Sequence, residues 1–239
     1  QELTSMDHED DDPGTTWNER ARSDKPDHMS PRMAWRAIQA AMPNNAIISS
    51  DIGNNCAIGN AYPSFQEGRK YLAPGLFGPC GYGFPAIAGA KIAQPKVPVI
   101  GFAGDGAFGI SMNEMTAVGR GEWPAITMVI FRNYQWGAEK RNTTLWFDDN
   151  FVGTELDEDV SYAAIANACG LVGVQATSMD DLTDKLDAAI KAQMNEGKTT
   201  FIEIILNKEL GEPFRRDAMK APVSVAGISK NDMIPQKGA

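Results

Sequence analysis

An acidic glycine motif is the strongest chemical signal in the chain. The residues GDG at 104–106 directly follow VPVIGFA at 97–103, an apolar run that predicts a buried strand. After 26 intervening residues, Asn133 ends the next apolar run, AITMVIFR at 125–132. In a parallel sheet, the carboxyl ends of neighbouring strands open onto one crevice. We therefore expect Asp105 and Asn133 to lie side by side at that edge.

This pair of side chains is suited to a hard divalent cation. Magnesium prefers carboxylate and amide oxygens, which Asp105 and Asn133 supply. A bound magnesium ion can hold a diphosphate, and the amino terminus of a helix after Gly106 would add backbone donors to it. The motif therefore predicts a site for Mg²⁺ and a diphosphate.

The same glycines permit a second interpretation. GDGAFG at 104–109 also fits G-x-G-x-x-G, the dinucleotide-binding fingerprint, which is a weak signal by itself. That fingerprint needs an acidic residue at the end of the next strand, whereas Arg132 and Asn133 stand there. Moreover, Asp105 would repel a pyrophosphate unless a cation lay between them. Both observations favour the metal–diphosphate interpretation.

The elements that must position these residues alternate between strand and helix. Apolar runs predict strands at 46–50, 97–103, 125–132 and 199–206. Capping residues and helical periodicity predict helices at 31–42, 53–62, 111–120, between Ser161 and Gly170, and between Ser178 and Gly197, and residues 78–93 predict a glycine-rich loop that leads into a helix. The helix after Ser161 carries Ala164, Ile165 and Ala168 on one face, and the helix after Ser178 places Leu182, Leu186, Ile190 and Met194 at four-residue steps. This order predicts an α/β fold, a doubly wound, mainly parallel sheet with helices on both faces.

Charge and composition divide the chain into three parts. Residues 1–30 carry nine acidic against three basic residues, a net −6 of the chain's −9, and predict an acidic linker. Residues 31–210 form the predicted binding domain. Residues 211–239 lack periodicity and form a carboxy-terminal extension that could cover an active site.

Several classes of function are disfavoured by composition. The two histidines, His8 and His28, both precede the predicted domain, which argues against Ser–His and Cys–His catalysis and most transition-metal sites. The three cysteines, Cys56, Cys80 and Cys169, form no CxxC pair, so neither a disulfide framework nor a zinc site is expected. No basic patch suggests a nucleic-acid partner, and no apolar run is long enough to span a membrane. In the absence of a targeting signal, a cytoplasmic location is expected.

Three further segments, together with the GDG motif, indicate a resemblance to a known family. SDIGNN at 50–55, GPCGYGFP at 78–85 and RNYQWG at 132–137 occur in the order found in thiamine-diphosphate enzymes. Together with the GDG motif, they resemble the acetolactate-synthase-like branch over residues 31 to 206. The resemblance implies that the cofactors are thiamine diphosphate and Mg²⁺.

The resemblance also implies a role for particular residues. Magnesium would be bound by Asp105, Asn133 and the backbone carbonyl of Gln135. The cofactor-binding residues would be Gly53, Asn54, Asn55, Gly78, Cys80, Gly104, Asp105, Gly106 and Ala107. Gly78 falls where the family binds the aminopyrimidine ring through a backbone carbonyl. Cys80 falls where the branch has a bulky apolar residue that bends the cofactor, although it can also be read as a plain buried thiol.

Within this branch, the chain is most similar to the sulfoacetaldehyde acetyltransferases. WGAEK at 136–140 and PFRRDA at 213–218 are the specific segments. That family converts sulfoacetaldehyde and phosphate to acetyl phosphate and sulfite. In this superfamily, the glutamate that activates the cofactor lies on a pyrimidine-binding domain, so no certain catalytic residue is expected here. The resemblance therefore implies a pyrimidine-binding partner domain, on the same or another chain, and a homodimer or homotetramer.

Two small anions, sulfoacetaldehyde and phosphate, would need cationic contacts. Arginine forks match such oxyanions well. The candidate substrate contacts are Trp136, Lys140, Arg141, Arg215 and Arg216. Each cation can also be read as a solvated surface residue, and Trp136 as a packing residue.

Two alternative functions remain open at this point. One is another thiamine-diphosphate lyase, such as a sulfopyruvate-decarboxylase-like subunit or an acetolactate-synthase relative. The other is a nucleotide-binding Rossmann module without catalytic activity. Phosphate-dependent release of sulfite would separate the sulfoacetaldehyde acetyltransferase reaction from those of the other thiamine-diphosphate lyases. Magnesium-dependent binding of thiamine diphosphate would argue against a non-catalytic Rossmann module.

Overall fold

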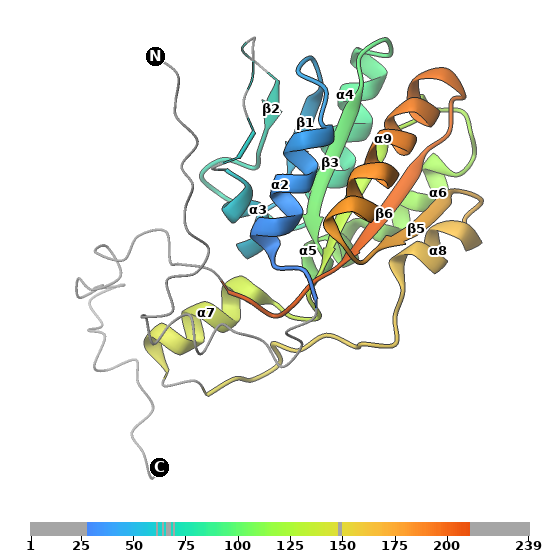
Figure 1. The fold of residues 1–239 in the computed structure, drawn as a ribbon. Helices are drawn as coiled ribbons and strands as arrows, with labels where there is room; N and C mark the ends of the chain where they lie inside the picture. Colours follow the sequence, from blue (N-terminus) through green and yellow to red (C-terminus); the bar gives the residue numbers. More distant parts are fainter. Residues whose placement is uncertain are drawn as a thin grey trace.

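The fold is centred on a six-stranded parallel sheet (Figure 1). The computed structural model describes residues 28–60, 62–63, 65, 68, 70–147 and 150–210. Within these residues, the strand order is β2-β1-β3-β4-β6-β5, and every neighbouring pair is parallel. The strands are β1 (Ile47–Ser50), β2 (Tyr71–Leu72), β3 (Val99–Gly104), β4 (Thr127–Arg132), β5 (Val172–Ala176) and β6 (Thr200–Ile205). The predicted parallel sheet is therefore confirmed.

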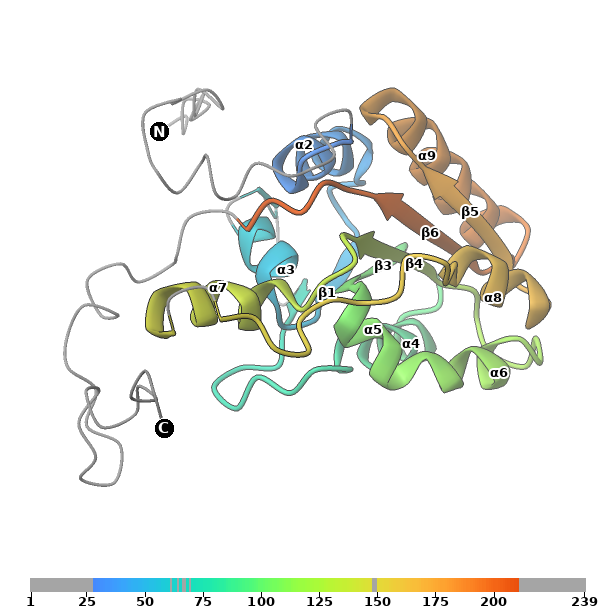
Figure 2. The ribbon, with the colours of Figure 1, turned by 90° about the horizontal axis from the view of Figure 1, so that it is seen from below.

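Helices cover both faces of this sheet (Figure 2), as a doubly wound fold requires. One face packs under α2 (Pro31–Ala41), α3 (Asn54–Gly59) and α9 (Met179–Asn195). The other packs under α4 (Gly83–Ala93), α5 (Asp105–Ser111), α6 (Met115–Val118) and α8 (Tyr162–Ala168). Successive strand residues such as Ile47 and Ile48 enter opposite cores, because side chains alternate along a strand. None of the described helices combines the length and apolar character needed to cross a lipid bilayer.

Three elements were not predicted from the sequence. Strand β2 has only two residues, and β5 is a half-exposed edge strand without a continuous apolar run. Helix α7 (Gly137–Trp146) follows the carboxyl end of the sheet and projects beyond it beside α3 (Figures 1 and 2). Its sequence, GAEKRNTTLW, has no apolar stripe that would indicate a helix.

Two predicted helices need correction. The prediction of one helix at 111–120 was wrong, because α5 begins at Asp105, directly after β3, and a 3-10 turn at Met112–Glu114 separates it from α6. In α8, the face that carries Ala164, Ile165 and Ala168 is not the one that is fully buried. Tyr162, Ala163 and Ala166 are buried instead, because the Tyr162 ring packs edge-on against Phe108 at 5.2 Å between centroids.

Helix α9 largely matches its predicted face. Leu182, Leu186 and Ile190 are buried, whereas Met194 is half exposed. The neighbouring Gln193 takes the buried position, where its amide nitrogen donates to the Val99 carbonyl at 2.8 Å. A polar side chain can be buried there because the β3 backbone supplies its hydrogen-bond partners.

Trp35 in α2 fixes the start of α3. Its indole packs on Phe102 and Phe131, with ring centroids 4.7 and 5.2 Å away. The indole N–H donates to the Asn55 carbonyl at 2.8 Å. A Cβ at Gly59 would lie only 2.1 Å from the Trp35 ring, so only glycine allows this approach. The helix that carries Asn54 and Asn55 is thereby held against the sheet.

Candidate cofactor and metal site

A pocket lies at the carboxyl edge of the sheet, where four segments meet. It is enclosed by residues 52–55, 78–80, 104–107 and 133–139. Every residue predicted to bind the cofactor or the metal lines it: Gly53, Asn54, Asn55, Gly78, Cys80, Gly104, Asp105, Gly106, Ala107, Asn133 and Gln135. The sequence prediction thus identified residues that come together, and their roles as ligands stay predictions.

The sheet register brings the two central residues together. Gly104 of β3 pairs with Phe131 of β4, so Asp105 and Arg132 follow at the same height. Asn133 comes one residue later, and both Asp105 and Asn133 are 1% exposed. The neighbouring strand ends therefore deliver a carboxylate and a carboxamide to one wall of the pocket.

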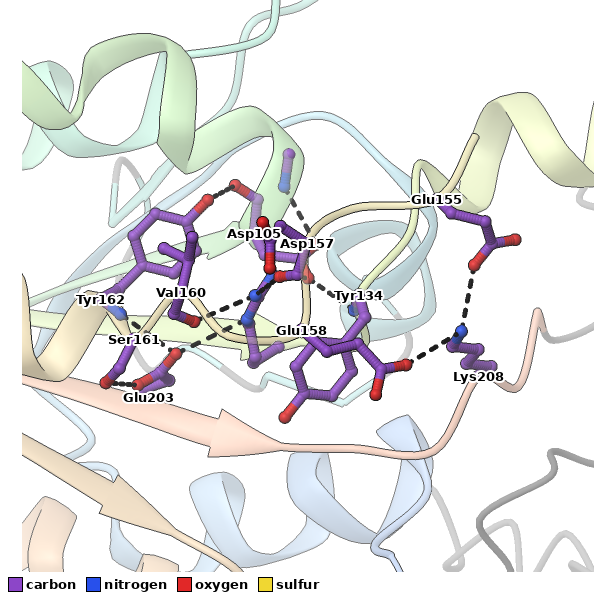
Figure 3. A network of polar contacts seen from close by, with 12 residues as sticks. Asp105, Tyr134, Glu155, Asp157, Glu158, Val160, Ser161, Tyr162, Glu203 and Lys208 are labelled. Atoms are coloured by element: carbon purple, nitrogen blue, oxygen red, sulfur yellow. Dashed lines mark hydrogen bonds and ion pairs between the residues drawn. The ribbon is translucent and has the colours of Figure 1, made fainter. Parts of the chain in front are cut away.

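The Asp105 carboxylate is held by donors on both of its oxygens (Figure 3). Oδ1 accepts from the Gly106 N–H at 2.9 Å. Oδ2 accepts from the Tyr134 N–H at 2.7 Å and from Arg132 Nη1 at 3.1 Å. Burial raises the pKa of Asp105 to about 6, although the Arg132 charge and these hydrogen bonds oppose the rise. A cation in the pocket would favour the charged form further.

The segment after Asn133 is folded so that the Gln135 backbone carbonyl points away from residues 154–156. Residues 134–136 pair antiparallel with residues 154–156 through backbone hydrogen bonds of 2.8 and 2.9 Å. These bonds use the Trp136 N–H and the Tyr134 carbonyl. Because backbone groups alternate in direction, the Gln135 carbonyl points away from 154–156. Tyr134 has a φ of 60°, the left-handed region, which turns the chain at this point.

Four buried polar atoms of the pocket residues have no hydrogen-bond partner among the described residues. They are Asn54 Nδ2, Asn55 Oδ1, Asn133 Nδ2 and Gln135 Oε1. Buried polar groups in native proteins are almost always paired. The pocket therefore offers both donors and acceptors to a polar ligand, and this donor set fits a magnesium–diphosphate group.

Gly106 is required by close packing within the pocket wall. A Cβ at Gly106 would lie 2.8 to 3.0 Å from three ring atoms of Trp136. Gly104, in contrast, has open space where its Cβ would be. The two glycines of the motif therefore differ, because packing requires glycine at 106 and leaves open space at 104.

Asp51 was not predicted to have a role, yet it shapes the glycine loop. Its carboxylate is 4% exposed and accepts from the backbone N–H groups of Ile52, Gly81 and Gly83 at 2.8, 3.1 and 2.6 Å. Burial raises the pKa of Asp51, and these backbone donors oppose the rise. An acidic residue directly after a buried strand was the signal in the sequence. The pocket also includes four residues of the SDIGNN and WGAEK segments to which the sequence analysis gave no role, namely Ile52, Gly137, Ala138 and Glu139.

The candidate substrate contacts divide into three groups. Trp136 lines the pocket, and Arg141 reaches it indirectly, since its Nη1 donates to Asn54 Oδ1 at 3.1 Å. Burial lowers the pKa of Arg141. Lys140 instead pairs with Glu155 and lies over the Phe151 ring, 4.9 Å from its centroid. Arg215 and Arg216 lie outside the described residues.

The chain is similar to proteins named sulfoacetaldehyde acetyltransferase and, at much lower identity, to proteins named acetolactate synthase. It is 77% identical over 237 residues to the sulfoacetaldehyde acetyltransferase of Roseovarius nubinhibens, covering 99% of this chain and 39% of that protein. It is 24% identical over 209 residues to the acetolactate synthase large subunit of Haemophilus influenzae, covering 87% of this chain and 34% of that one. The chain thus spans about two fifths of the length of the curated acetyltransferase it matches at 77% identity.

A solved structure agrees with the fold, and a family model identifies the domain. The thiamine diphosphate-dependent 4-hydroxybenzoylformate decarboxylase of Rhodococcus jostii RHA1 superposes with a TM-score of 0.66 at 22% identity, over 75% of this chain and 33% of that chain. At this identity, the likeness concerns the fold. The model "Thiamine pyrophosphate enzyme, C-terminal TPP binding domain" matches residues 51–204, more than half of the chain. The chain therefore belongs to the family of C-terminal thiamine-pyrophosphate-binding domains of thiamine pyrophosphate enzymes.

Proposed function

We propose that this chain is the diphosphate- and magnesium-binding part of an enzyme that converts sulfoacetaldehyde and phosphate to acetyl phosphate and sulfite. The observation that carries the proposal is the pocket in which Asp105, Asn133 and the glycine loops meet. The choice of reaction is supported by a relative named sulfoacetaldehyde acetyltransferase, which is 77% identical over 99% of this chain. Identity to an acetolactate synthase is far lower, at 24%.

In this proposal, the strand ends hold the metal and the loops hold the diphosphate. Asp105, Asn133 and the Gln135 carbonyl would bind Mg²⁺, which prefers such oxygen ligands. The diphosphate would lie against residues 53–55 and 104–107, where Asn54 Nδ2 is a buried donor without a partner in the described chain. Thiamine diphosphate, when bound, supplies the nucleophilic carbon and the electron sink that the reaction requires.

The remaining pocket residues would position the organic part of the cofactor and the substrate. Gly78 and Cys80 line the pocket, and the Trp136 ring packs against Gly106. Arg141, beside Asn54, is a cation within reach of a bound anion. A guanidinium matches the oxygens of a sulfonate or a phosphate. These side chains would orient the reactants and exclude water.

The activity is proposed to need a second domain. The chain covers 39% of the matching acetyltransferase, so most of that relative's length lies outside this alignment. We propose that a pyrimidine-binding domain, on the same chain or on a partner chain, supplies the glutamate that activates the cofactor. We further propose a cytoplasmic homodimer or homotetramer. The complete enzyme below means this chain together with that domain.

The reaction is tested by following both products in the complete enzyme. Sulfoacetaldehyde, thiamine diphosphate and Mg²⁺ are supplied with and without phosphate, and sulfite and acetyl phosphate are measured. We expect equal amounts of the two products, and only when phosphate is present. No sulfite release in this assay, together with condensation of pyruvate in a parallel assay that supplies pyruvate, would instead identify an acetolactate-synthase relative.

The division between domains has its own control. This chain alone, under the same conditions, should release no sulfite, because the activating glutamate is absent. Turnover by the isolated chain would show that the second domain is dispensable. That result would overturn the proposed division and leave the assignment of the reaction intact.

A further inference from the structure

Arg132 is a buried cation directly beside the proposed metal site, and it begins the RNYQWG segment, in which it was given no role. It is the last residue of β4 and is 1% exposed. Its Nη1 donates to Asp105 Oδ2 at 3.1 Å, and its Nη2 donates to the carbonyls of Asp157 and Val160, the latter at 3.0 Å. Its Nε lies 3.6 Å from Glu203 Oε1. The guanidinium therefore contacts partners on several sides at once, and these partners, Asp105, Asp157, Val160 and Glu203, are labelled in Figure 3.

Aromatic rings and a second carboxylate fix the guanidinium in place. Its central carbon lies 4.3 Å from the Tyr134 ring centroid and 5.3 Å from that of Tyr162. Glu203, on β6, is 1% exposed and accepts from the Tyr162 and Ala163 N–H groups at 3.1 and 3.2 Å. Glu203 is thus anchored by the start of α8 and cannot follow Arg132 if the latter moves.

The contacts of the two Asp105 oxygens differ in a way that matters for metal binding. Oδ2 is occupied by Arg132 Nη1 and by the Tyr134 N–H. Within the described residues, Oδ1 accepts only the Gly106 N–H, and Gly106 lines the pocket. The protein therefore holds the carboxylate through Oδ2, while Oδ1 lies beside the pocket.

We propose that Arg132 is a positioning residue for the metal-binding carboxylate of Asp105. It clamps Oδ2 so that Oδ1 is presented to the metal in one fixed orientation, and Glu203 holds the clamp. This inference rests on the proposed function, since it needs a metal at Asp105. Residues that orient metal ligands through hydrogen bonds typically change metal affinity or activity 10- to 100-fold when replaced.

The test is the apparent affinity for Mg²⁺ in the complete enzyme, measured by calorimetry at saturating thiamine diphosphate. We expect Arg132→Lys and Arg132→Met each to weaken it by about 10- to 100-fold. Lysine keeps the positive charge but lacks the planar fork that bridges Asp105, Glu203 and the two carbonyls. Arg132→Met leaves two buried carboxylates without their cation, which strongly destabilises a fold. If this variant does not fold, the Mg²⁺ affinity of Arg132→Lys alone tests the proposal.

Lys91→Met is the matched control for loss of a buried cation. Lys91 is 2% exposed and lies at the opposite end of the sheet, where its Nζ donates to the Val97 carbonyl at 2.9 Å. It should lower thermal stability and leave the apparent Mg²⁺ affinity within about twofold. The proposal is overturned if Arg132→Lys binds Mg²⁺ as tightly as the unmodified enzyme does. It is also overturned if Arg132→Met binds Mg²⁺ more tightly, which would mean that Arg132 only repels the metal. If the unmodified enzyme itself binds thiamine diphosphate without Mg²⁺, the proposed metal site fails first, and the two failures are distinguishable.

Discussion

The two glycines of the GDG motif should respond in opposite ways to the same substitution. At Gly106, an alanine Cβ would lie 2.8 to 3.0 Å from ring atoms of Trp136, closer than real Cβ contacts allow. At Gly104, no atom lies within 4 Å of the added Cβ, and its φ of −69° is allowed for any residue. Gly104 lines the pocket, so the added methyl group would occupy space meant for the cofactor.

The magnitudes follow from these contacts. Overpacking of a tight site costs about 1–3 kcal/mol, whereas glycine to alanine within a helix gains about 0.5–1 kcal/mol. Gly106→Ala should therefore lose about 0.5–2 kcal/mol, or a few degrees of melting temperature. Gly104→Ala should be neutral or slightly stabilising, through lower entropy of the unfolded chain. Its thiamine diphosphate affinity should fall about tenfold or more if the methyl group meets the cofactor.

Gly89→Ala provides the matched control. Gly89 lies within α4, on the surface, with open space where its Cβ would be. It should raise the melting temperature and leave cofactor affinity unchanged. The measurements are thermal unfolding and calorimetry with thiamine diphosphate and Mg²⁺ on the complete enzyme. If Gly106→Ala is as stabilising as Gly89→Ala, or if Gly104→Ala binds the cofactor normally, the description of this pocket wall is wrong.

Two other predictions concern the metal and the glycine loop. Asp105→Ala and Asn133→Ala should each abolish magnesium-dependent binding of thiamine diphosphate in calorimetry, and unchanged affinity in both would contradict the metal assignment. Asp51→Asn places an amide against backbone donors 2.6 to 3.1 Å away, where a charge-assisted hydrogen bond contributes about 1.5–3 kcal/mol. It should lower both the melting temperature and cofactor affinity, whereas Asp187→Asn, at an exposed helical ion pair with Lys191, should change neither.

The sequence predicted the central residues of the site because they depend on a local rule. Asp105 and Asn133 each follow an apolar strand, and parallel strands align their carboxyl ends. No knowledge of distant contacts was needed to expect them together. The parallel register, with Gly104 opposite Phe131, then places Asp105 level with Arg132 and Asn133 one residue further on, and both Asp105 and Asn133 line one pocket.

What the sequence did not predict depends on contacts between distant segments. The pairing of 134–136 with 154–156, which directs the Gln135 carbonyl, joins two stretches without any periodic signal. The clamp on Asp105 requires Glu203, which lies nearly a hundred residues later on β6. Strand β5 is identified only by its pairing with β6. Its own residues are half exposed at the edge of the sheet and show no strand pattern in the sequence.

The course of the chain after β6 supports a prediction about the carboxy-terminal extension. Strand β6 is parallel to β4 and β5, so the chain leaves it at the pocket edge. The carbonyl of Lys208 accepts from Gln135 Nε2 at 2.9 Å, and Leu210 is buried, with its Cδ2 3.6 Å from the position a Cβ would take at Gly137. The chain is therefore next to the pocket at residue 210, five residues before Arg215.

Arg215 and Arg216 are adjacent in sequence, so their side chains cannot point the same way in regular structure. We therefore expect one of them to contact the substrate anion and the other to face elsewhere. A charge-assisted hydrogen bond in a closed site contributes about 1.5–3 kcal/mol, or roughly 10- to 150-fold. One of Arg215→Ala and Arg216→Ala should raise the KM for phosphate or sulfoacetaldehyde in the complete enzyme by that factor. The other should be nearly silent, and both should keep their affinity for thiamine diphosphate, because residues 53–55 and 104–107 are untouched. If neither variant changes the KM for phosphate or for sulfoacetaldehyde by more than about twofold, Arg215 and Arg216 are surface residues without a role in substrate binding. Arg141, beside Asn54, is then the next cation to replace.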